Sequence, residues 1–340
     1  MRSNTYTSLI LSMVSTGDSS VVSLLDIEQA RERIKDYIKL TPVRRSQYLS
    51  ESIGGSVHLK LENAQVTGSF KVRGALNRLM TLDREQVTKG VITASTGNHG
   101  LGTAFAASQL GISAAVVFPT KASVVKLKKM LDAGVQVIQD VGYADIETHA
   151  RELAAERSLT YVSPYNDPMI IAGAGTSGLE LTEQLDSIDS VVVPIGGGGL
   201  ISGIAIAIKA ASPDTEVIGV QSEVSPEVYE SWKAGHWVDS KESDSLAQGL
   251  MGGVEPDSIT LDIIQEKVDR VVLVKEKSIL DAMRVLYEQE QLLVEGAGAA
   301  STALILEHGS EFAGKHVAAI VSGGNITRDE LQALLLKNPC

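Results

Sequence analysis

Hydrophobic residues along this chain follow two alternating patterns. Short runs rich in valine, isoleucine and alanine are separated by longer segments in which apolar residues recur every three or four positions. The short runs predict strands at 57–63, 90–96, 113–119, 136–140, 191–196, 216–223 and 316–324. The longer segments predict a helix that begins after Ser23 and others at 69–82, 99–111, 123–134, 144–158 and 199–212. Buried strands that alternate with helices indicate an α/β fold, with parallel twisted sheets flanked by helices on both faces.

The length of the chain favours two domains. A chain of 340 residues exceeds the size at which a single hydrophobic core usually grows. No linker rich in proline, glycine and serine separates the halves, so we expect the second domain to be inserted into the first. Residues 1–22 are rich in serine and threonine and are predicted to form a loose N-terminal leader.

Charge and cysteine content exclude several classes of protein. The net charge of −12 argues against nucleic-acid binding, which needs clustered lysine and arginine. The single cysteine, Cys340, excludes a disulfide within the chain and a cysteine-based zinc site, and it favours a reducing compartment. The apolar run at 9–14 is too short for a secretion signal, and no apolar stretch approaches the roughly 20 residues of a membrane span. We therefore expect a cytoplasmic protein that contacts neither membrane nor nucleic acid.

The sequence PIGGGGLISG (194–203) lies between a predicted strand and a predicted helix. Each glycine in such a row costs about 1 kcal/mol relative to alanine, and a simple turn would need only one of them. Four glycines at a helix start expose a row of backbone N–H groups, which suits a phosphate group. The usual dinucleotide and Walker glycine motifs are absent, so NAD and ATP are not indicated.

Two further segments carry candidate chemistry. ASTGNHG (94–100) also lies between a strand and a helix, and backbone amides in such a turn can hold a carboxylate. In GSFKVRGA (68–75), Lys71 lies in the first turn of a predicted helix, where the helix dipole does not favour a positive charge. A lysine with a lowered pKa attacks carbonyl groups. A phosphate cradle, a carboxylate turn and a lysine together indicate a pyridoxal phosphate site, for which Ser322 in SGGN (322–325) is a candidate partner of the ring nitrogen.

These motifs resemble those of the fold-type II pyridoxal phosphate enzymes, the tryptophan synthase β-like group. Within that group the chain is similar to the serine/threonine dehydratases and serine racemases from about Leu40 to Asp329. The motifs SFKVRGA, STGNHG, IAGAGT (171–176), PIGGGGL, VEGAGA (294–299) and SGGN occur in the family's order. The resemblance implies a large cofactor-binding domain of 23–65 and 166–336 and a small substrate-side domain of 66–165. It also implies a homodimer.

The resemblance assigns roles to individual residues. Lys71 is similar to the Schiff-base lysine, Asn98 to the residue beside the cofactor's 3-hydroxyl, and Ser322 to the partner of the pyridine nitrogen. The phosphate cradle corresponds to Gly196, Gly197, Gly198, Gly199 and the Leu200 amide. The loop that holds the substrate carboxylate corresponds to Ser95, Thr96, Gly97, Asn98 and His99. Thr96 replaces the serine that serves racemases as a second base, so its hydroxyl leaves racemisation open.

The implied activity is deamination of L-threonine or L-serine to a 2-oxo acid and ammonia. Departures from the family pattern keep other β-hydroxy amino acids open, such as 3-hydroxyaspartate or a hydroxyectoine-derived compound, because SLAQGLMGG (245–253) differs from the common dehydratase form. A bound mono- or divalent cation would use Glu223 and Glu227, although Gln221 stands where an acid is common. A β-replacement enzyme and a cofactor-binding protein without activity remain alternatives.

Overall fold

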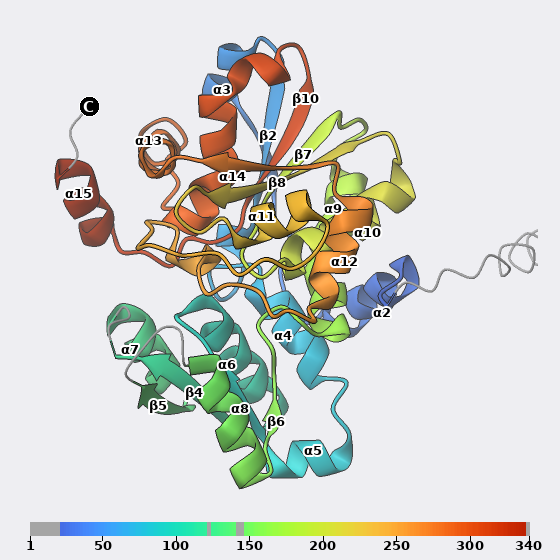
Figure 1. Ribbon diagram of the computed structural model, residues 1–340, viewed down its shortest axis with the longest axis vertical. Helices are drawn as coiled ribbons and strands as arrows, with labels where there is room; N and C mark the ends of the chain where they lie inside the picture. Colours follow the sequence, from blue (N-terminus) through green and yellow to red (C-terminus); the bar gives the residue numbers. More distant parts are fainter. Residues whose placement is uncertain (1–20, 121–123, 141–145, 338–340) are drawn as a thin grey trace, which may run out of the picture.

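The structure is a computed structural model that describes residues 21–120, 124–140 and 146–337. Most of the predicted leader, the first residues of two predicted helices and Cys340 lie outside these ranges. The described chain contains two separate sheets, each covered by helices, one above the other in Figure 1. Among the described residues, no helix is long and apolar enough to cross a membrane.

The larger sheet has six strands in the order β1-β2-β10-β7-β8-β9. Its strands are β1 (Val43–Ser46), β2 (Ser56–Leu61), β7 (Ser190–Pro194), β8 (Glu216–Ser222), β9 (Arg270–Val274) and β10 (His316–Val321). All neighbours are parallel except β1 and β2, which form an antiparallel pair at one edge. The prediction of parallel sheets is therefore correct with the exception of this edge strand.

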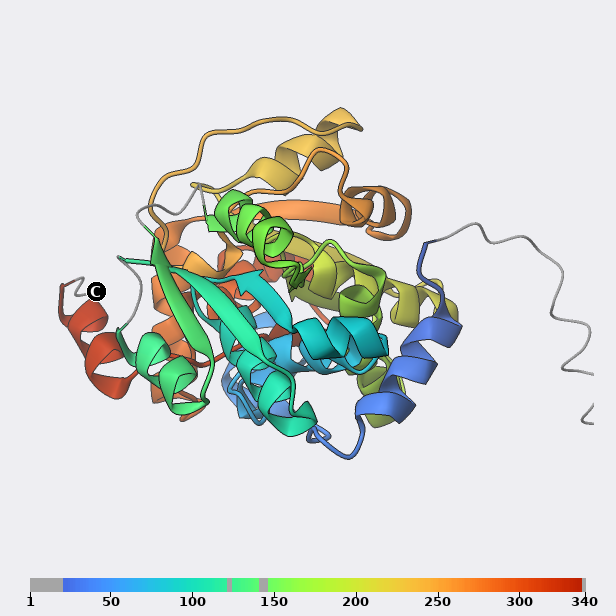
Figure 2. The same cartoon turned by 90° about the horizontal axis from the view of Figure 1, so that it is seen from below.

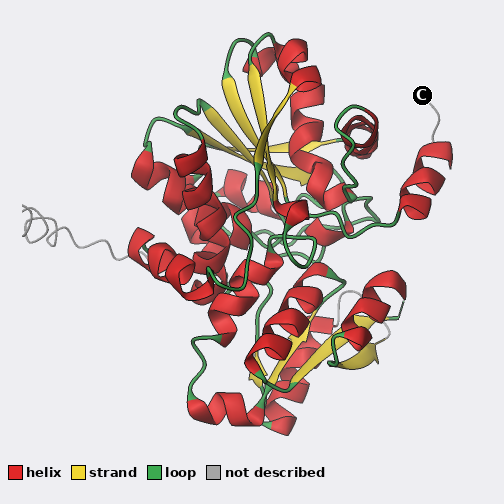
Figure 3. Cartoon of the chain, turned by 180° about the vertical axis from the view of Figure 1, so that it is seen from behind, coloured by secondary structure: helices red, strands yellow, loops and turns green. Residues whose placement is uncertain are grey.

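Helices cover both faces of the six-stranded sheet, because its strands carry apolar side chains on both sides. Val192 and Ala319 pack with α3 (Gln47–Ile53), α13 (Glu276–Glu288) and α14 (Gly296–Glu307) on one face. Val191 and Ile320 pack on the other face with α9 (Pro168–Gln184), α10 (Gly199–Ala211), α11 (Glu227–Ala234) and α12 (Ile259–Lys267). Figure 3 shows the strands between these two helical layers. This arrangement explains why the strands read as continuous apolar runs.

The smaller sheet is fully parallel, in the order β5-β4-β3-β6. It consists of β3 (Val91–Ala94), β4 (Ala114–Pro119), β5 (Gln136–Asp140) and β6 (Thr160–Tyr161). One face packs on α4 (Lys71–Leu79), α6 (Asn98–Leu110) and α7 (Val124–Asp132), and the other packs on α8 (Ile146–Arg157), as the view from below shows (Figure 2). The remaining helices are α2 (Leu24–Ile34), α5 (Arg84–Lys89) and α15 (Arg328–Lys337).

All seven predicted strands and all six predicted helices are present in the described residues, with ends shifted by no more than four residues. The strands β1, β6 and β9 and eight helices were not predicted. The two-domain boundaries are consistent with two sheets but stay a prediction.

Close helix contacts join the two parts of the molecule. A Cβ atom on Gly173 of α9 would lie 2.6 Å from the carbonyl oxygen of Arg73 in α4, and one on Gly203 of α10 would lie 2.4 Å from that of Ile171. The glycines of IAGAGT and LISG therefore allow three helix backbones to touch. This packing fixes α4, which carries Lys71 at its first position.

Candidate active site

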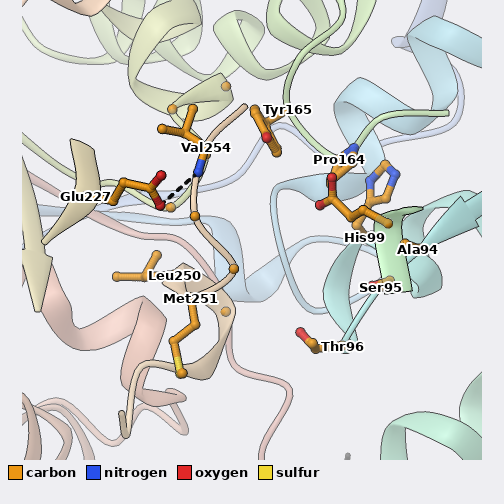
Figure 4. Close-up of a pocket in the computed structure, with 18 of the residues that line it drawn as sticks. Ala94, Ser95, Thr96, His99, Pro164, Tyr165, Glu227, Leu250, Met251 and Val254 are labelled. Carbon is orange, nitrogen blue, oxygen red and sulfur yellow. Dashed lines mark hydrogen bonds between the residues drawn. The ribbon is translucent and has the colours of Figure 1, made fainter. Parts of the chain in front are cut away.

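The loops that follow β3, β7 and β10 open into one cavity of about 1110 Å³ between the two sheets. This location agrees with the rule that ligands of parallel sheets bind beyond the carboxyl ends of the strands. In Figure 4, one wall carries Ser95, Thr96 and His99, and the opposite wall carries Leu250 and Met251. Of the predicted site residues, the structure brings to this cavity Lys71, Ser95, Thr96, Asn98, His99, Gly196, Gly197, Gly198, Gly199, Leu200, Glu227 and Ser322.

The glycine row forms an open anion cradle. Gly198 has a left-handed backbone, with φ of +88°, and it precedes α10 without any side-chain cap. A Cβ atom on Gly197 would lie 2.3 Å from Cγ of the Tyr165 ring, so only glycine fits there. The first amides of α10 therefore face the cavity with no capping side chain, at the positive end of the helix dipole. Such a cradle fits the phosphate of a cofactor.

Lys71 is the first residue of α4 and projects into the same cavity. Its Nζ donates a hydrogen bond of 2.8 Å to the carbonyl oxygen of Pro164 and lies 5.2 Å from the centre of the Phe70 ring. Burial lowers the pKa of Lys71 to about 8, against the opposing effect of Glu147. A lysine held in this way is not a solvated surface charge, and a large fraction of it is neutral near pH 8.

The turn after β3 is held by Ser95. Its Oγ accepts hydrogen bonds from the amides of Gly97, at 3.0 Å, and Gly100, at 2.8 Å. The Gly97 amide therefore already has a partner, and Gly97 is absent from the described lining of the cavity. The role of Gly97 in substrate binding stays a prediction.

A network that the sequence did not predict surrounds Asn98. The Asn98 amide group donates a hydrogen bond of 2.5 Å to Glu295 and accepts one of 2.9 Å from Asn325. Glu295 also forms an ion pair of 2.8 Å with Lys126 of α7. The VEGAGA and SGGN motifs contained Glu295 and Asn325, but only the fold shows that they meet Asn98. Ser322 lies nearby, 5% exposed, and its Oγ donates to the carbonyl oxygen of Ala297 at 3.3 Å.

His99 lies in the cavity wall as a neutral side chain. Burial, followed by the nearby charge of Lys71, lowers the pKa of His99 to about 3. The ring is 4% exposed, and its Nδ1 has no hydrogen-bond partner among the described residues. His99 can therefore offer a polar atom to a ligand but no positive charge.

The structure does not support the predicted cation site. Glu223 is exposed and is not among the residues that line the cavity. Glu227 already accepts hydrogen bonds from the Val254 amide at 3.1 Å (Figure 4) and from the Trp237 ring at 3.2 Å. Within the described ranges, no group of three or more histidine, cysteine, aspartate or glutamate side chains could hold a metal ion.

The family model for the pyridoxal-phosphate dependent enzymes matches residues 34–323. The chain belongs to this family. It is 40% identical, over 318 residues, to L-threonine ammonia-lyase of Thermotoga maritima, covering 93% of this chain and 79% of that protein. It is 42% identical to the catabolic L-threonine dehydratase TdcB of Staphylococcus aureus, covering 90% of each.

Solved structures give the same assignment. The processed threonine deaminase isoform 2 of Solanum lycopersicum superposes with a TM-score of 0.88 at 32% identity, covering 96% of this chain and 95% of that one. Maize serine racemase superposes with a TM-score of 0.87 at 33% identity, covering 93% and 97%. These comparisons confirm three predictions: the family, the fold class, and the assignment of the chain as a pyridoxal phosphate-dependent enzyme.

Proposed function

We propose that this enzyme is an ammonia-lyase that converts a β-hydroxy amino acid, such as L-threonine or L-serine, to a 2-oxo acid and ammonia. The observation that carries the proposal is the shared cavity of Lys71, with its lowered pKa, and the uncapped amides at the start of α10. The names of the related threonine ammonia-lyase and dehydratase support the choice of reaction.

The residues present fit pyridoxal phosphate, and each has a role in the proposal. The amides of the glycine row and Leu200 would hold the phosphate, Lys71 would hold the aldehyde, and Asn98 would be the partner of the 3-hydroxyl. Ser322 would be the partner of the ring nitrogen, and because a hydroxyl is a poor acid it would leave that nitrogen largely unprotonated. The turn at 95–99 holds the substrate carboxylate, with backbone amides and the Ser95 and Thr96 hydroxyls as donors.

When bound, pyridoxal phosphate supplies the electron sink that makes the α-proton of an amino acid acidic. The substrate amine would first replace Lys71 at the aldehyde, and the released Lys71 could then take that proton at Nζ, because burial keeps much of the free amine neutral. The α-proton and the β-hydroxyl would leave together as water, and hydrolysis of the released enamine by another water would give a 2-oxo acid and ammonia.

The test is 2-oxo acid release by the holoenzyme from L-threonine, L-serine and D-serine, with Lys71→Ala as the matched control. We expect release from at least one L-amino acid and a loss of at least about a thousandfold in the variant. No 2-oxo acid from any β-hydroxy amino acid, with cofactor bound, would overturn the proposal. Reaction only when sulfide is present would indicate β-replacement.

Racemisation is a second candidate function. Thr96 brings a hydroxyl to the cavity, and maize serine racemase is among the similar structures. Chiral chromatography of L-serine incubations detects it as D-serine. Because Thr96 is also a proposed donor to the substrate carboxylate, Thr96→Val should slow both reactions, and it should lower the ratio of D-serine to 2-oxo acid if its hydroxyl serves racemisation.

The proposal also includes a homodimer, on the basis of family resemblance, and a location in the cytoplasm, on the basis of the single cysteine and the short apolar run at 9–14. Light scattering of the purified protein tests the first point, and cell fractionation tests the second. A bound cation is not part of the proposal, because Glu227 already has two partners and Glu223 is exposed.

A further inference from the structure

The lining of the cavity is strongly acidic. Among the described residues that line it, six carry carboxylates, and we call this set the acidic rim: Glu147, Glu227, Glu242, Asp244, Glu255 and Asp257. The only basic side chains in the same lining are Lys71 and Arg151. In the proposed function Lys71 binds the cofactor aldehyde, so its charge does not neutralise the acidic rim.

The remaining basic group is already paired. Arg151 of α8 forms an ion pair with Glu255 and lies over the Tyr161 ring, 4.2 Å from its centre. Glu255 in addition accepts a hydrogen bond of 2.5 Å from Asn166. His99 adds no charge, because its pKa is lowered to about 3. A substrate side chain in this cavity therefore meets an excess of carboxylates over basic groups and no free cation in the described part of the wall.

The acids are held where they are by the fold. Glu242 accepts hydrogen bonds of 3.2 Å from the amides of Gly252 and Gly253, and Glu227 accepts one from Val254. Burial and the repulsion of Glu255 raise the pKa of Glu147 to about 7. The pKa of Glu227 is raised to about 7 as well, by burial first and by Glu242 in addition. For both carboxylates burial outweighs the charges and hydrogen bonds that act in the other direction, so the ionised form would be stabilised by a positive charge placed beside it.

The cavity also has room and a free polar atom. Its volume of about 1110 Å³ is at the upper end of the range for ligand sites, more than the cofactor and a four-carbon amino acid require. His99, buried and with no partner for Nδ1 among the described residues, offers a hydrogen-bonding atom in the same wall.

We propose that the preferred substrate is a β-hydroxy α-amino acid whose side chain ends in a cation, such as a second ammonium group. This inference rests on the proposed ammonia-lyase function and narrows its substrate. The α-carboxylate and the reacting carbon meet the cofactor end of the cavity, while the distal ammonium lies against the acidic rim. A distal carboxylate, as in 3-hydroxyaspartate, would meet like charges and is disfavoured.

Three compounds of similar shape test the charge alone. They are 2,4-diamino-3-hydroxybutanoate, 2-amino-3-hydroxypentanoate and 3-hydroxyaspartate, which carry an ammonium, a methyl and a carboxylate beyond the β-carbon. We expect kcat/KM of the holoenzyme to be at least about tenfold higher for the ammonium compound than for the methyl compound, and lowest for the carboxylate compound. Equal or better turnover of the methyl or carboxylate compound would overturn the inference.

Variants of the exposed acids test whether the acidic rim causes the preference for the ammonium compound. In Asp244→Asn/Asp257→Asn, the ratio of kcat/KM for the ammonium compound to that for the methyl compound should fall about three- to tenfold. Asp214→Asn, at an exposed aspartate that does not line the cavity, should leave the ratio unchanged. A ratio that stays the same in the double variant would contradict the role of the rim.

Failure of the proposed function has a different signature. In that case none of the three compounds, nor threonine or serine, yields a 2-oxo acid. Calorimetric titration of the holoenzyme with each compound still ranks their dissociation constants, and the same order of ammonium, methyl and carboxylate is expected. Tighter binding of the carboxylate compound would reject the inference independently of turnover.

Discussion

Lys71 and Arg73 lie two residues apart on α4, yet their surroundings differ completely. Arg73 is fully buried, with its guanidinium group bonded to Glu62 at 2.8 Å and to Glu180 at 2.6 Å. Lys60 joins the same cluster through Glu180 at 2.5 Å. Lys71 has no such carboxylate partner, and its ammonium bonds only a backbone carbonyl oxygen among the described residues.

The difference is visible in the pKa values. Burial works against the charge of both residues, but Glu62 and Glu180 raise the pKa of Arg73 above its usual value, whereas the pKa of Lys71 falls to about 8. Arg73 is thereby fixed as a permanent charge that joins the turn after β2, α4 and α9, whereas Lys71 keeps a partly neutral amine, as its proposed role as a nucleophile requires. Two positions of a single motif thus have different environments.

The largest effect is expected from breaking the buried cluster. Arg73→Met leaves Glu62 buried without its ion-pair partner and Glu180 with Lys60 alone, which should lower the free energy of unfolding by about 3–5 kcal/mol. Chemical denaturation monitored by circular dichroism measures this loss. Arg84→Met, at an exposed position on α5, is the control and should change stability by less than about 0.5 kcal/mol. An equally small effect of Arg73→Met would mean that the cluster does not hold α4.

A smaller effect is expected from filling the anion cradle. The Cβ of Gly197→Ala would lie 2.3 Å from the Tyr165 ring, and that ring is tethered because its hydroxyl accepts a hydrogen bond from the Glu255 amide at 3.0 Å. The loop must shift, so we expect affinity for pyridoxal phosphate to fall about ten- to a hundredfold while the fold is retained. Fluorescence titration of the apoprotein gives the affinity.

The control for the cradle is Gly309→Ala, because the nearest atom to its Cβ would be 3.6 Å away and the residue is outside the cavity. This variant should bind the cofactor like the unaltered protein. Unchanged affinity of Gly197→Ala for pyridoxal phosphate would contradict the proposal that the glycine row binds the phosphate.

The smallest effect is the dependence of cofactor uptake on pH. Because burial lowers the pKa of Lys71 to about 8, the neutral amine increases about tenfold per pH unit below that value and then levels off. The initial rate at which the apoprotein regains cofactor absorbance should follow this curve between about pH 6 and pH 10. A rate that still rises steeply above pH 9 would indicate an ordinary lysine.

Local patterns predicted the strands that form short apolar runs, most of the helices predicted from a polar face, and α10, whose start is marked by the glycine row. They missed α9 and α14, in which residues 170–181 and 296–305 are buried without interruption, so that no polar face marks either helix. They missed β1, because VRRS is polar and lies at a sheet edge.

The candidate site also has a part that local motifs predicted and a part that they missed. Lys71 and the glycine row lie in contiguous motifs whose chemistry can be read locally. The contacts of Asn98 with Glu295 and Asn325 join residues about 200 positions apart, and the acidic rim combines α8 with the chain around 227–257. The Asn98 network and the acidic rim depend on tertiary structure, and no spacing of residues in the sequence predicts them.

The most direct test of the contrast measures cofactor absorbance and unfolding on the same two variants, Lys71→Ala and Arg73→Met. The account predicts that Lys71→Ala loses the violet absorbance of the bound cofactor and the 2-oxo acid activity but unfolds within about 1 kcal/mol of the unaltered protein. Arg73→Met should unfold much earlier. Retained absorbance and activity in Lys71→Ala, or a loss of stability as large as that of Arg73→Met, would contradict the account.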